Sequence, residues 1–435
     1  MAQMGKHICT KVGLFQLRTV FALICGALSL SVVGQSVSGS RTADKPPPVA
    51  ELQVFLLDAQ QLEASRRGVR EGRLAAPWAK LKTDAQQALR QGPFSVLDKA
   101  VTPPSGDKHD YMSQAPYFWP DPNKPNGLPY IRRDGERNPE INKITDHRSI
   151  DELENAVETL ALTYYFGGDE TYAAKAVVLL RAFYLDPATR MNPNLEYAQF
   201  IPGVNTGRGI GLIETRGFTR IVDAVGLLEG SKALTPDDER GLKEWFGKFL
   251  QWMIDSKNGR EEAAAKNNHG TFYDVQIASF ALFVGRRNLA KQVLEQAKQK
   301  RIAAQIEPDG RQPLELARTK AWSYSHGNLD GLMSLATLGE RVGVDLWNFQ
   351  TSDGRGIRRA LDFLTPIALG EKKWEYPEIE GGVKAESLFP LMRRAAAVYR
   401  DQAYQKLIAK VPEVNSADRR RLLRPDVNPT KQAQR

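Results

Sequence analysis

From residue 149 onward the chain is a succession of helical patterns, and this limits the possible folds more than any other feature. Apolar residues recur with helical spacing, and clusters of Gly, Pro and Asn separate the segments. No run alternates with period two for long enough to be a convincing strand. We expect helices over residues 149–166, 170–184, 212–229, 236–256, 271–285, 287–304, 314–338, 355–368 and 385–409. The sequence therefore predicts an all-α protein.

Two helix starts have specific signals. Ser149, with Glu152 three residues later, has the pattern of a capping box. Thr235-Pro236 supplies an N-cap and a proline at the first helical position. With a further helical pattern over residues 52–90, the chain predicts antiparallel helix hairpins in a single (α/α)n toroid or incomplete barrel with long rim loops. Helical periodicity alone does not establish that the ring closes, and the lack of a strict repeat disfavours a regular solenoid.

The N-terminal region has the order of a secretory signal. A basic stretch precedes an apolar run of about 14 residues, which is too short to span a bilayer, and small polar residues follow. We predict a signal peptide over residues 1–38, a proline-containing linker over 39–50, the toroid over 51–410 and a basic, flexible tail over 411–435. Both cysteines lie in the leader, so no disulfide is expected. The predicted location is periplasmic or secreted, with no stable membrane span after cleavage.

The charge of the chain favours an anionic partner. The formal net charge is +9, and the leader contributes three of the cations and no acid. A modest positive field suits an anionic polysaccharide. Nucleic acid is not expected as a partner, because no basic helix with interleaved aromatic residues is present in the sequence. The sequence does not indicate the oligomeric state.

Residues 109–147 form a stretch rich in proline, aromatic residues and arginine. The prolines prevent a regular helix, and a long irregular loop in a compact domain is usually functional. Its rings suit stacking on sugars and its guanidinium groups suit carboxylates. The substrate-binding candidates here are Trp119, Tyr130 and Arg133. A structural lid with its aromatic side chains packed inward explains the pattern equally well.

A second stretch, residues 266–274, combines amides with an imidazole. Asn267 and Asn268 directly precede His269, and farther along Arg318 lies six residues before Tyr324. Cleavage of a uronate polymer by β-elimination needs neutralisation of the C6 carboxylate, a base for the C5 proton and an acid for the departing O4. A nearby guanidinium would favour the phenolate form of a tyrosine.

Simpler explanations exist for these residues. Asparagines often cap helices, and a tyrosine is often half-buried without any catalytic role. Six residues exceed one and a half turns, so a straight helix would not put Arg318 and Tyr324 on one face. Their contact requires a bend or helix end near residues 323–325.

The chain resembles the alginate lyase superfamily of α/α-toroid polysaccharide lyases, over most of residues 105–395. The resemblance is found in residues 117–122, 129–135 and 267–274, and in Arg318 with Tyr324. It implies that Asn268, His269 and Arg318 bind or neutralise the uronate carboxylate. It also implies that Tyr324 acts as acid and, in syn elimination from mannuronate, as base, with His269 as base for the other epimer.

The resemblance predicts a lyase that cleaves a β-1,4-linked uronate polymer, preferentially mannuronate-rich alginate, and leaves unsaturated ends. The long loop is similar to the branch that contains alginate- and glucuronan-active members, so a glucuronan lyase is the first alternative. An inverting glycoside hydrolase would need two carboxylates roughly 6.5–9.5 Å apart. A non-catalytic uronan-binding protein is the third alternative. The carboxylate candidates for hydrolysis are Glu214, Asp274 and Glu315.

Further groove candidates come from other loops. Asn205 and Arg208 lie where a loop meets a helix start, and His326 follows Tyr324 by two residues. Together with Asn267 they complete the predicted substrate-binding set. No histidine forms a metal-binding spacing with another His or Cys. Neither a metal nor a cofactor is expected.

Overall fold

A computed structural model describes residues 52–379, 381–399, 404, 406–408 and 417–424. The chain divides into a segment ending at Ala50 and one compact unit from Glu51 onward. The predicted signal peptide and linker lie outside the described residues, as does most of the predicted tail. Within the described part of the tail, Arg420–Leu423 forms helix α15, and Leu422 is buried in the hydrophobic core.

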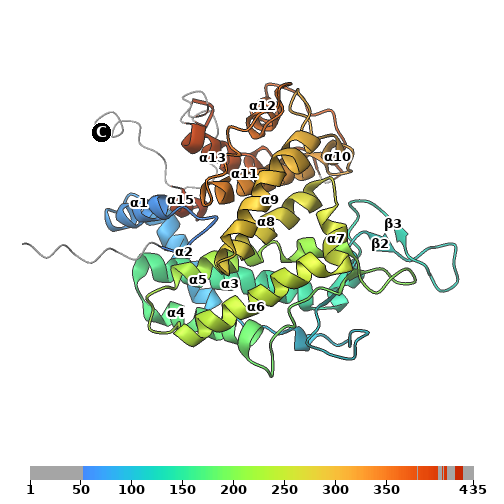
Figure 1. Cartoon of the computed structure of the whole chain (residues 1–435), viewed down its shortest axis with the longest axis horizontal. Coiled ribbons are helices and arrows are strands. Elements are labelled where there is room, and N and C mark those ends of the chain that lie inside the picture. Colours follow the sequence, from blue (N-terminus) through green and yellow to red (C-terminus); the bar gives the residue numbers. More distant parts are fainter. Residues whose placement is uncertain (1–51, 380, 400–403, 405, 409–416, 425–435) are drawn as a thin grey trace, which may run out of the picture. The chain divides into compact units, whose positions relative to one another are not determined.

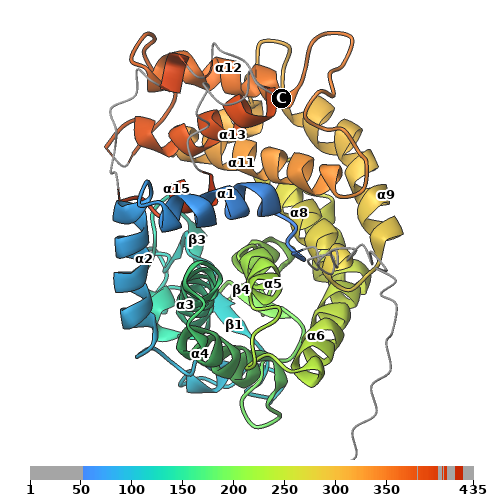
Figure 2. The same ribbon diagram turned by 90° about the vertical axis from the view of Figure 1, so that its left-hand side faces the viewer.

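The compact unit is built from two layers of helices (Figures 1 and 2). An inner series packs each helix against the next: α3 (Asp146–Gly167), α5 (Phe218–Leu227), α8 (Asn268–Phe283) and α11 (Ala321–Glu340). Outer helices pack against this series: α2 (Ala75–Ala88), α4 (Glu170–Leu180), α6 (Pro236–Asp255), α9 (Arg287–Ala297) and α12 (Ile357–Ala368). The remaining helices are α1 (Ala59–Arg70), α7 (Lys257–Ala263), α10 (Pro313–Leu316) and α13 (Phe389–Tyr399). This confirms the predicted all-α toroid.

The starts of α6 and α3 show how far local signals determine helix boundaries. At α6, Thr235 caps the helix, Asp238 completes a capping box and Pro236 occupies the first turn, as predicted. At α3, the predicted capping box is wrong, because the helix begins at Asp146 and Ser149 lies within its first turn. The reason is tertiary: the buried Asp146 carboxylate pairs with Lys99 at 3.0 Å and accepts the Met112 N–H at 2.9 Å. These contacts hold the helix start one turn earlier.

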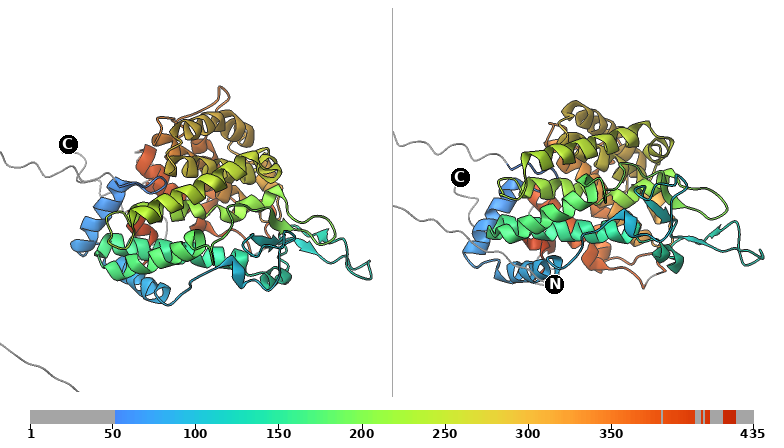
Figure 3. Two further views of the ribbon diagram at one scale, coloured as in Figure 1. Left: turned by 60° about the horizontal axis from the view of Figure 1, so that its bottom comes forward. Right: turned by 90° about the horizontal axis from the view of Figure 1, so that it is seen from below.

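Four short strands occur at the rim, where the sequence predicted none. β1 (Met112–Gln114) pairs in parallel with β4 (Tyr197–Phe200), and β2 (Phe118–Trp119) pairs antiparallel with β3 (Ile131–Arg132). Strands of two to four residues are too short to show a period-two pattern. In Figure 3 the β2–β3 arm projects from one end of the helical layers, and α1 lies at the other end.

Several predicted helices are shorter or divided. The pattern over 52–90 forms α1 and α2, and the pattern over 212–229 forms a 3-10 segment (Gly209–Thr215) followed by α5. The predicted helix over 314–338 is divided into α10 and α11. In the part of the chain that is described, no helix has the length and apolar character needed to cross a bilayer.

Candidate active site

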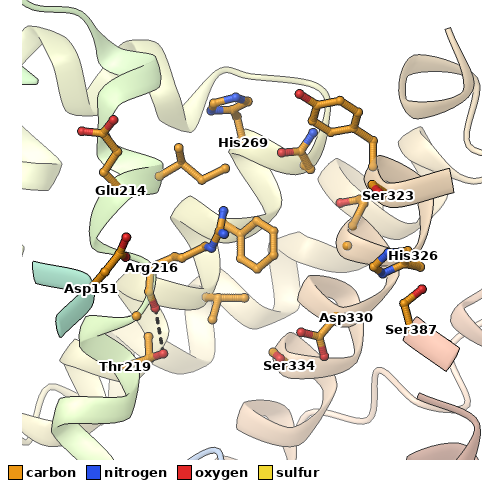
Figure 4. Close-up of a pocket in the computed structure, with 18 of the residues that line it drawn as sticks. Asp151, Glu214, Arg216, Thr219, His269, Ser323, His326, Asp330, Ser334 and Ser387 are labelled. Carbon is orange, nitrogen blue, oxygen red and sulfur yellow. Dashed lines mark hydrogen bonds between the residues drawn. The ribbon is translucent and has the colours of Figure 1, made fainter. Parts of the chain in front are cut away.

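A groove of about 2150 Å³ is lined by the inner helices and the rim loops. Its wall includes Tyr117 from the long loop, Arg208, His269 at the start of α8 and Tyr324 at the start of α11. Figure 4 shows Arg216 extending into the groove between Asp151 and Glu214 on one side and His326 on the other. The groove therefore collects polar side chains from segments that are far apart in the sequence.

Arg318 and Tyr324 are in direct contact in this wall. Arg318 Nη2 donates to Tyr324 Oη at 2.7 Å, and the guanidinium carbon lies 3.8 Å from the centre of the tyrosine ring. Arg318 also holds Asp134 through both carboxylate oxygens, at 2.7 and 3.0 Å. Burial raises the pKa of Asp134, but the hydrogen bonds and charge of Arg318 outweigh this effect and hold that pKa well below its usual range. The arginine is thus fixed by a carboxylate and directed at a phenol.

The interruption of the helix between α10 and α11 makes this contact possible. Arg318 lies in the non-helical segment 317–320, and Tyr324 lies in the first turn of α11, which begins at Ala321. The predicted bend near residues 323–325 is wrong in position, since the helix is interrupted before Ala321. Thr319 secures this segment, because its Oγ1 donates to the Asp134 backbone oxygen at 3.0 Å.

A second phenol lies against Tyr324. Tyr324 Oη donates to Tyr117 Oη at 3.1 Å. Burial raises the pKa of Tyr324 well above its usual value, the hydrogen bond to Tyr117 adds to the rise, and the Arg318 charge opposes it. The Tyr324 oxygen is therefore in contact with a hydrogen-bond acceptor and with a cation, which have opposite effects on the pKa of the phenol.

His269 is oriented by a buried carboxylate. Its Nδ1 lies 2.7 Å from Oε1 of Glu262, whose side chain is only 1% exposed. A carboxylate at Nδ1 favours the tautomer with the proton on Nδ1, which leaves the lone pair on Nε2. Glu262 is carried by α7, immediately before the 264–267 turn that leads into α8. The imidazole is thus fixed in orientation at the wall of the groove.

Asn268 is held by a different buried carboxylate. Its backbone N–H and its Nδ2 donate to the two oxygens of Glu315, at 2.6 and 2.7 Å. The simpler explanation, helix capping by asparagine, does not account for the pair, because Asn267 occupies the N-cap position without a side-chain capping bond. Gly270 is required for close approach, since a Cβ there would lie 2.1 Å from the Ala265 oxygen. The first turn of α8 is therefore packed to present Asn268 and His269.

The structure brings together part of the predicted set. The groove is lined by Asn267, Asn268, His269, Arg208, Arg318, Tyr324 and His326. Outside that lining lie Trp119, Tyr130, Arg133 and Asn205. Trp119 Nε1 donates to the Glu136 oxygen, Arg133 lies over the Trp119 ring, Tyr130 Oη donates to Glu140, and Asn205 Oδ1 accepts the Ile201 N–H. These four residues form contacts within the rim loops, and their role toward substrate stays a prediction.

Sequence reasoning did not single out Tyr117, Asp134 or Glu262 as site residues. Tyr117 and Asp134 lie within the long loop, and only the fold brings them to Tyr324 and Arg318. Glu262 lies seven residues before His269, a spacing that crosses a turn and so has no local signature. An acid seven residues before a candidate histidine was the one signal that the sequence offered for Glu262.

The three carboxylates proposed for hydrolysis are each engaged in structural contacts. Asp274 pairs with Arg301 at 2.7 Å, Glu315 holds Asn268, and Glu214 accepts hydroxyl hydrogen bonds from Tyr111 and Ser113. Asp274 and Glu315 are buried. Of these three carboxylates, only Glu214 lines the groove.

Fold and groove together define a polysaccharide lyase of the α/α-toroid class. The chain belongs to the alginate lyase family, whose model matches residues 95–374. An alginate lyase from Bacteroides ovatus is similar to it, with 43% identity and a TM-score of 0.83 over 86% of this chain and 99% of that one.

More distant structures share the fold. Alginate lyase A1-III from Sphingomonas species A1 matches with a TM-score of 0.53 and 16% identity over 86% of this chain and 97% of that one. A variant of A1-III complexed with a tetrasaccharide matches with a TM-score of 0.57 and 15% identity, over 87% of this chain and 98% of that one. A comparison with curated protein sequences gave no match.

Proposed function

We propose that the protein cleaves alginate, preferentially at mannuronate, by β-elimination at the groove. The observation that supports this most strongly is the contact between Arg318 and Tyr324 with Tyr117 beside them. It provides a phenol with a cation and a second hydroxyl at its oxygen, as a residue that both takes and returns a proton requires. The similarity to the B. ovatus alginate lyase supports the choice of polymer.

In the proposed reaction, the proton leaves C5 of the uronate, the C4–O4 bond breaks, and a C4–C5 double bond forms. Asn268 and His269 lie near the carboxylate of that sugar and stabilise the charge that develops on it. For mannuronate, Tyr324 first loses its phenolic proton to solvent. The phenolate, which Arg318 stabilises, then takes the C5 proton and delivers it to O4 as the C4–O4 bond breaks. For the opposite epimer, His269 takes the C5 proton through Nε2, because Glu262 occupies Nδ1, and Tyr324 delivers its phenolic proton to O4.

Arg318 has a narrower proposed role than the sequence implied. Its guanidinium is already engaged by Asp134 and Tyr324, and its side chain is 15% exposed. A cation in contact with a phenol stabilises the phenolate form, which counteracts the effect of burial on the pKa. We therefore assign Arg318 to Tyr324 rather than to the substrate carboxylate.

The direct test is a product analysis with purified protein. Polymannuronate, polyguluronate and glucuronan are each incubated with the protein, and unsaturated ends are followed by ultraviolet absorbance. The proposal predicts the fastest rise with polymannuronate. Saturated reducing ends without that absorbance would indicate hydrolysis, and binding without any product would indicate a non-catalytic protein. A faster rise with glucuronan would contradict alginate as the preferred polymer.

The location of the protein follows from the same proposal. The basic, apolar and small-residue order of the N-terminal region supports export, and we propose that residues 1–38 direct it to the periplasm or beyond. Detection of the mature N-terminus in a periplasmic or culture fraction would test this.

A further inference from the structure

Arg208 is fixed in the groove wall by close packing on both of its sides. A Cβ on Gly207 would lie 1.9 Å from the Glu196 oxygen, and one on Gly209 would lie 2.6 Å from the Asn258 oxygen. Neither glycine accepts a side chain without a backbone shift, so the loop is held tightly against α7. The same helix carries Glu262, which orients His269. Arg208 and His269 are thus positioned by one element.

The guanidinium of Arg208 lacks a carboxylate partner among the described residues. Its Nη2 donates to the neutral Gln199 Oε1 at 2.7 Å, and its carbon lies 5.1 Å from the centre of the Phe118 ring. Its Nε is buried and, within the described chain, has no hydrogen-bond partner. Burial lowers the pKa of Arg208 to about 10, while Glu214 and Glu262 oppose that effect from a distance. Both of these carboxylates are already engaged, by Tyr111 with Ser113 and by His269.

Gln199 is held in an unfavourable backbone conformation beside this cation. Its φ is 50°, and it is the one non-glycine residue with a positive φ in the part of the chain that the structure describes. Its backbone N–H donates to Ser113 Oγ at 2.8 Å, and Ser113 in turn donates to Glu214. Strained residues that the surrounding structure holds in place cluster at functional sites. Here the Gln199 amide oxygen accepts from Arg208 Nη2, while Arg208 Nε has no hydrogen-bond partner among the residues that the structure describes.

We propose that Arg208, positioned by Gln199, binds the carboxylate of a uronate next to the one that is cleaved. This rests on the proposed function, because a polyuronate presents one carboxylate on every sugar. A guanidinium matches a carboxylate with two parallel hydrogen bonds, so an uncompensated arginine in a groove selects an anionic sugar over a neutral one. The cleaved sugar faces Tyr324 and His269, whereas Arg208 lies on the 199–208 loop. The contact between Arg208 and the neighbouring carboxylate is therefore made both in the bound state and in the transition state, so it contributes to affinity.

The test measures binding in the non-cleaving Tyr324→Phe background. The probes are an alginate tetrasaccharide and the same tetrasaccharide with its carboxyl groups reduced to alcohols. Adding Arg208→Gln should weaken binding of the charged probe at least tenfold and leave binding of the neutral probe within twofold. Equal weakening of both probes, or unchanged binding of the charged one, would overturn the proposal.

Two further variants keep the test interpretable. Arg208→Lys retains the charge but not the paired hydrogen bonds, and it should weaken binding of the charged probe less than Arg208→Gln. An equal loss in both variants would overturn a charge-based role. Arg240→Gln is the matched control for net charge, because Arg240 forms an exposed ion pair with Asp237 on α6. Production of unsaturated ends by the wild-type protein tests the proposed function independently of this binding measurement.

Discussion

Arg318 and Arg208 are both arginines of the groove wall, and the difference between their surroundings distinguishes their roles. Arg318 is held at both carboxylate oxygens of Asp134 and contacts the Tyr324 hydroxyl. Arg208 contacts a neutral amide and, among the described residues, forms no ion pair. A guanidinium with a fixed counter-charge acts on its neighbours inside the protein, whereas one without a counter-charge attracts an anion from outside. Residue type alone would have assigned the same role to both.

The largest effect that bears on this comparison is expected from Arg318→Gln. Removal of the cation from Tyr324 should lower kcat by about 100- to 1000-fold, the scale for loss of one charge-stabilising group. The lost charge favoured the phenolate, so the pKa of Tyr324 should rise in this variant. The limb of the kcat–pH profile that reports ionisation of Tyr324 should therefore move to higher pH. Initial rates on polymannuronate across a pH series measure both changes. A loss confined to KM would show that Arg318 binds substrate as Arg208 does.

Asp134→Asn should have a smaller effect on kcat and the opposite effect on the pH profile. The variant frees the guanidinium that Asp134 holds, so we expect kcat to fall by about tenfold, from loss of positioning. The Asp134 charge also raises the pKa of Tyr324, so its removal should move the same limb to lower pH. Shifts in the same direction for both variants would contradict the proposed Asp134–Arg318–Tyr324 arrangement. Circular dichroism of each variant checks that the fold is retained.

The dependence of KM on salt concentration should distinguish Arg208 from Arg318. Substrate binding through an uncompensated charge weakens as ions screen it. KM of the wild-type protein should therefore rise with NaCl, and the slope should be shallower in Arg208→Gln. Arg318→Gln should keep the wild-type slope, because Asp134 already neutralises that cation. Identical slopes in the wild type and Arg208→Gln would contradict the difference between the two residues.

The smallest effect is expected from a matched pair at Gln199. Gln199→Ala and Gln199→Gly both remove the amide from Arg208, so both should raise KM by the same few-fold factor. They differ in the backbone, because only glycine adopts a φ of 50° without strain. Gln199→Gly should therefore exceed Gln199→Ala by about 1 kcal/mol in free energy of unfolding. Chemical denaturation measures this difference, and equal stabilities would show that the backbone is not strained.

The sequence predicted the features that depend on local pattern. The succession of helices led to the correct fold class, and Thr235-Pro236 marked the start of α6. At α3 the local capping signal of Ser149 was overridden, because Lys99 and Met112 hold Asp146 at the helix start. Long-range contacts cannot be seen in a local pattern, and here they decided the boundary.

The candidate site shows the same difference between local patterns and long-range contacts. Asn268, His269, Arg318 and Tyr324 were predicted, and the structure places all four at the groove. The partners that orient them come from elsewhere in the chain, with Asp134 separated from Arg318 by 184 positions and Tyr117 from Tyr324 by 207. Arg208 was predicted as a substrate contact. Its lack of an ion pair among the described residues could be recognised only in the structure, where the carboxylates nearby have other partners. Sequence reasoning thus predicted residues that line the groove and missed the residues that orient or neutralise them.

The most direct test of this account compares Tyr324→Phe with Arg208→Gln, measuring turnover of polymannuronate and affinity for an alginate tetrasaccharide in each. Tyr324→Phe should lose at least 100-fold in kcat, the scale of proton-transfer catalysis, and keep wild-type affinity. Arg208→Gln should lose at least tenfold in affinity and far less in kcat. Loss of the same quantity in both variants, or wild-type turnover by Tyr324→Phe, would contradict the proposed division between catalysis and binding.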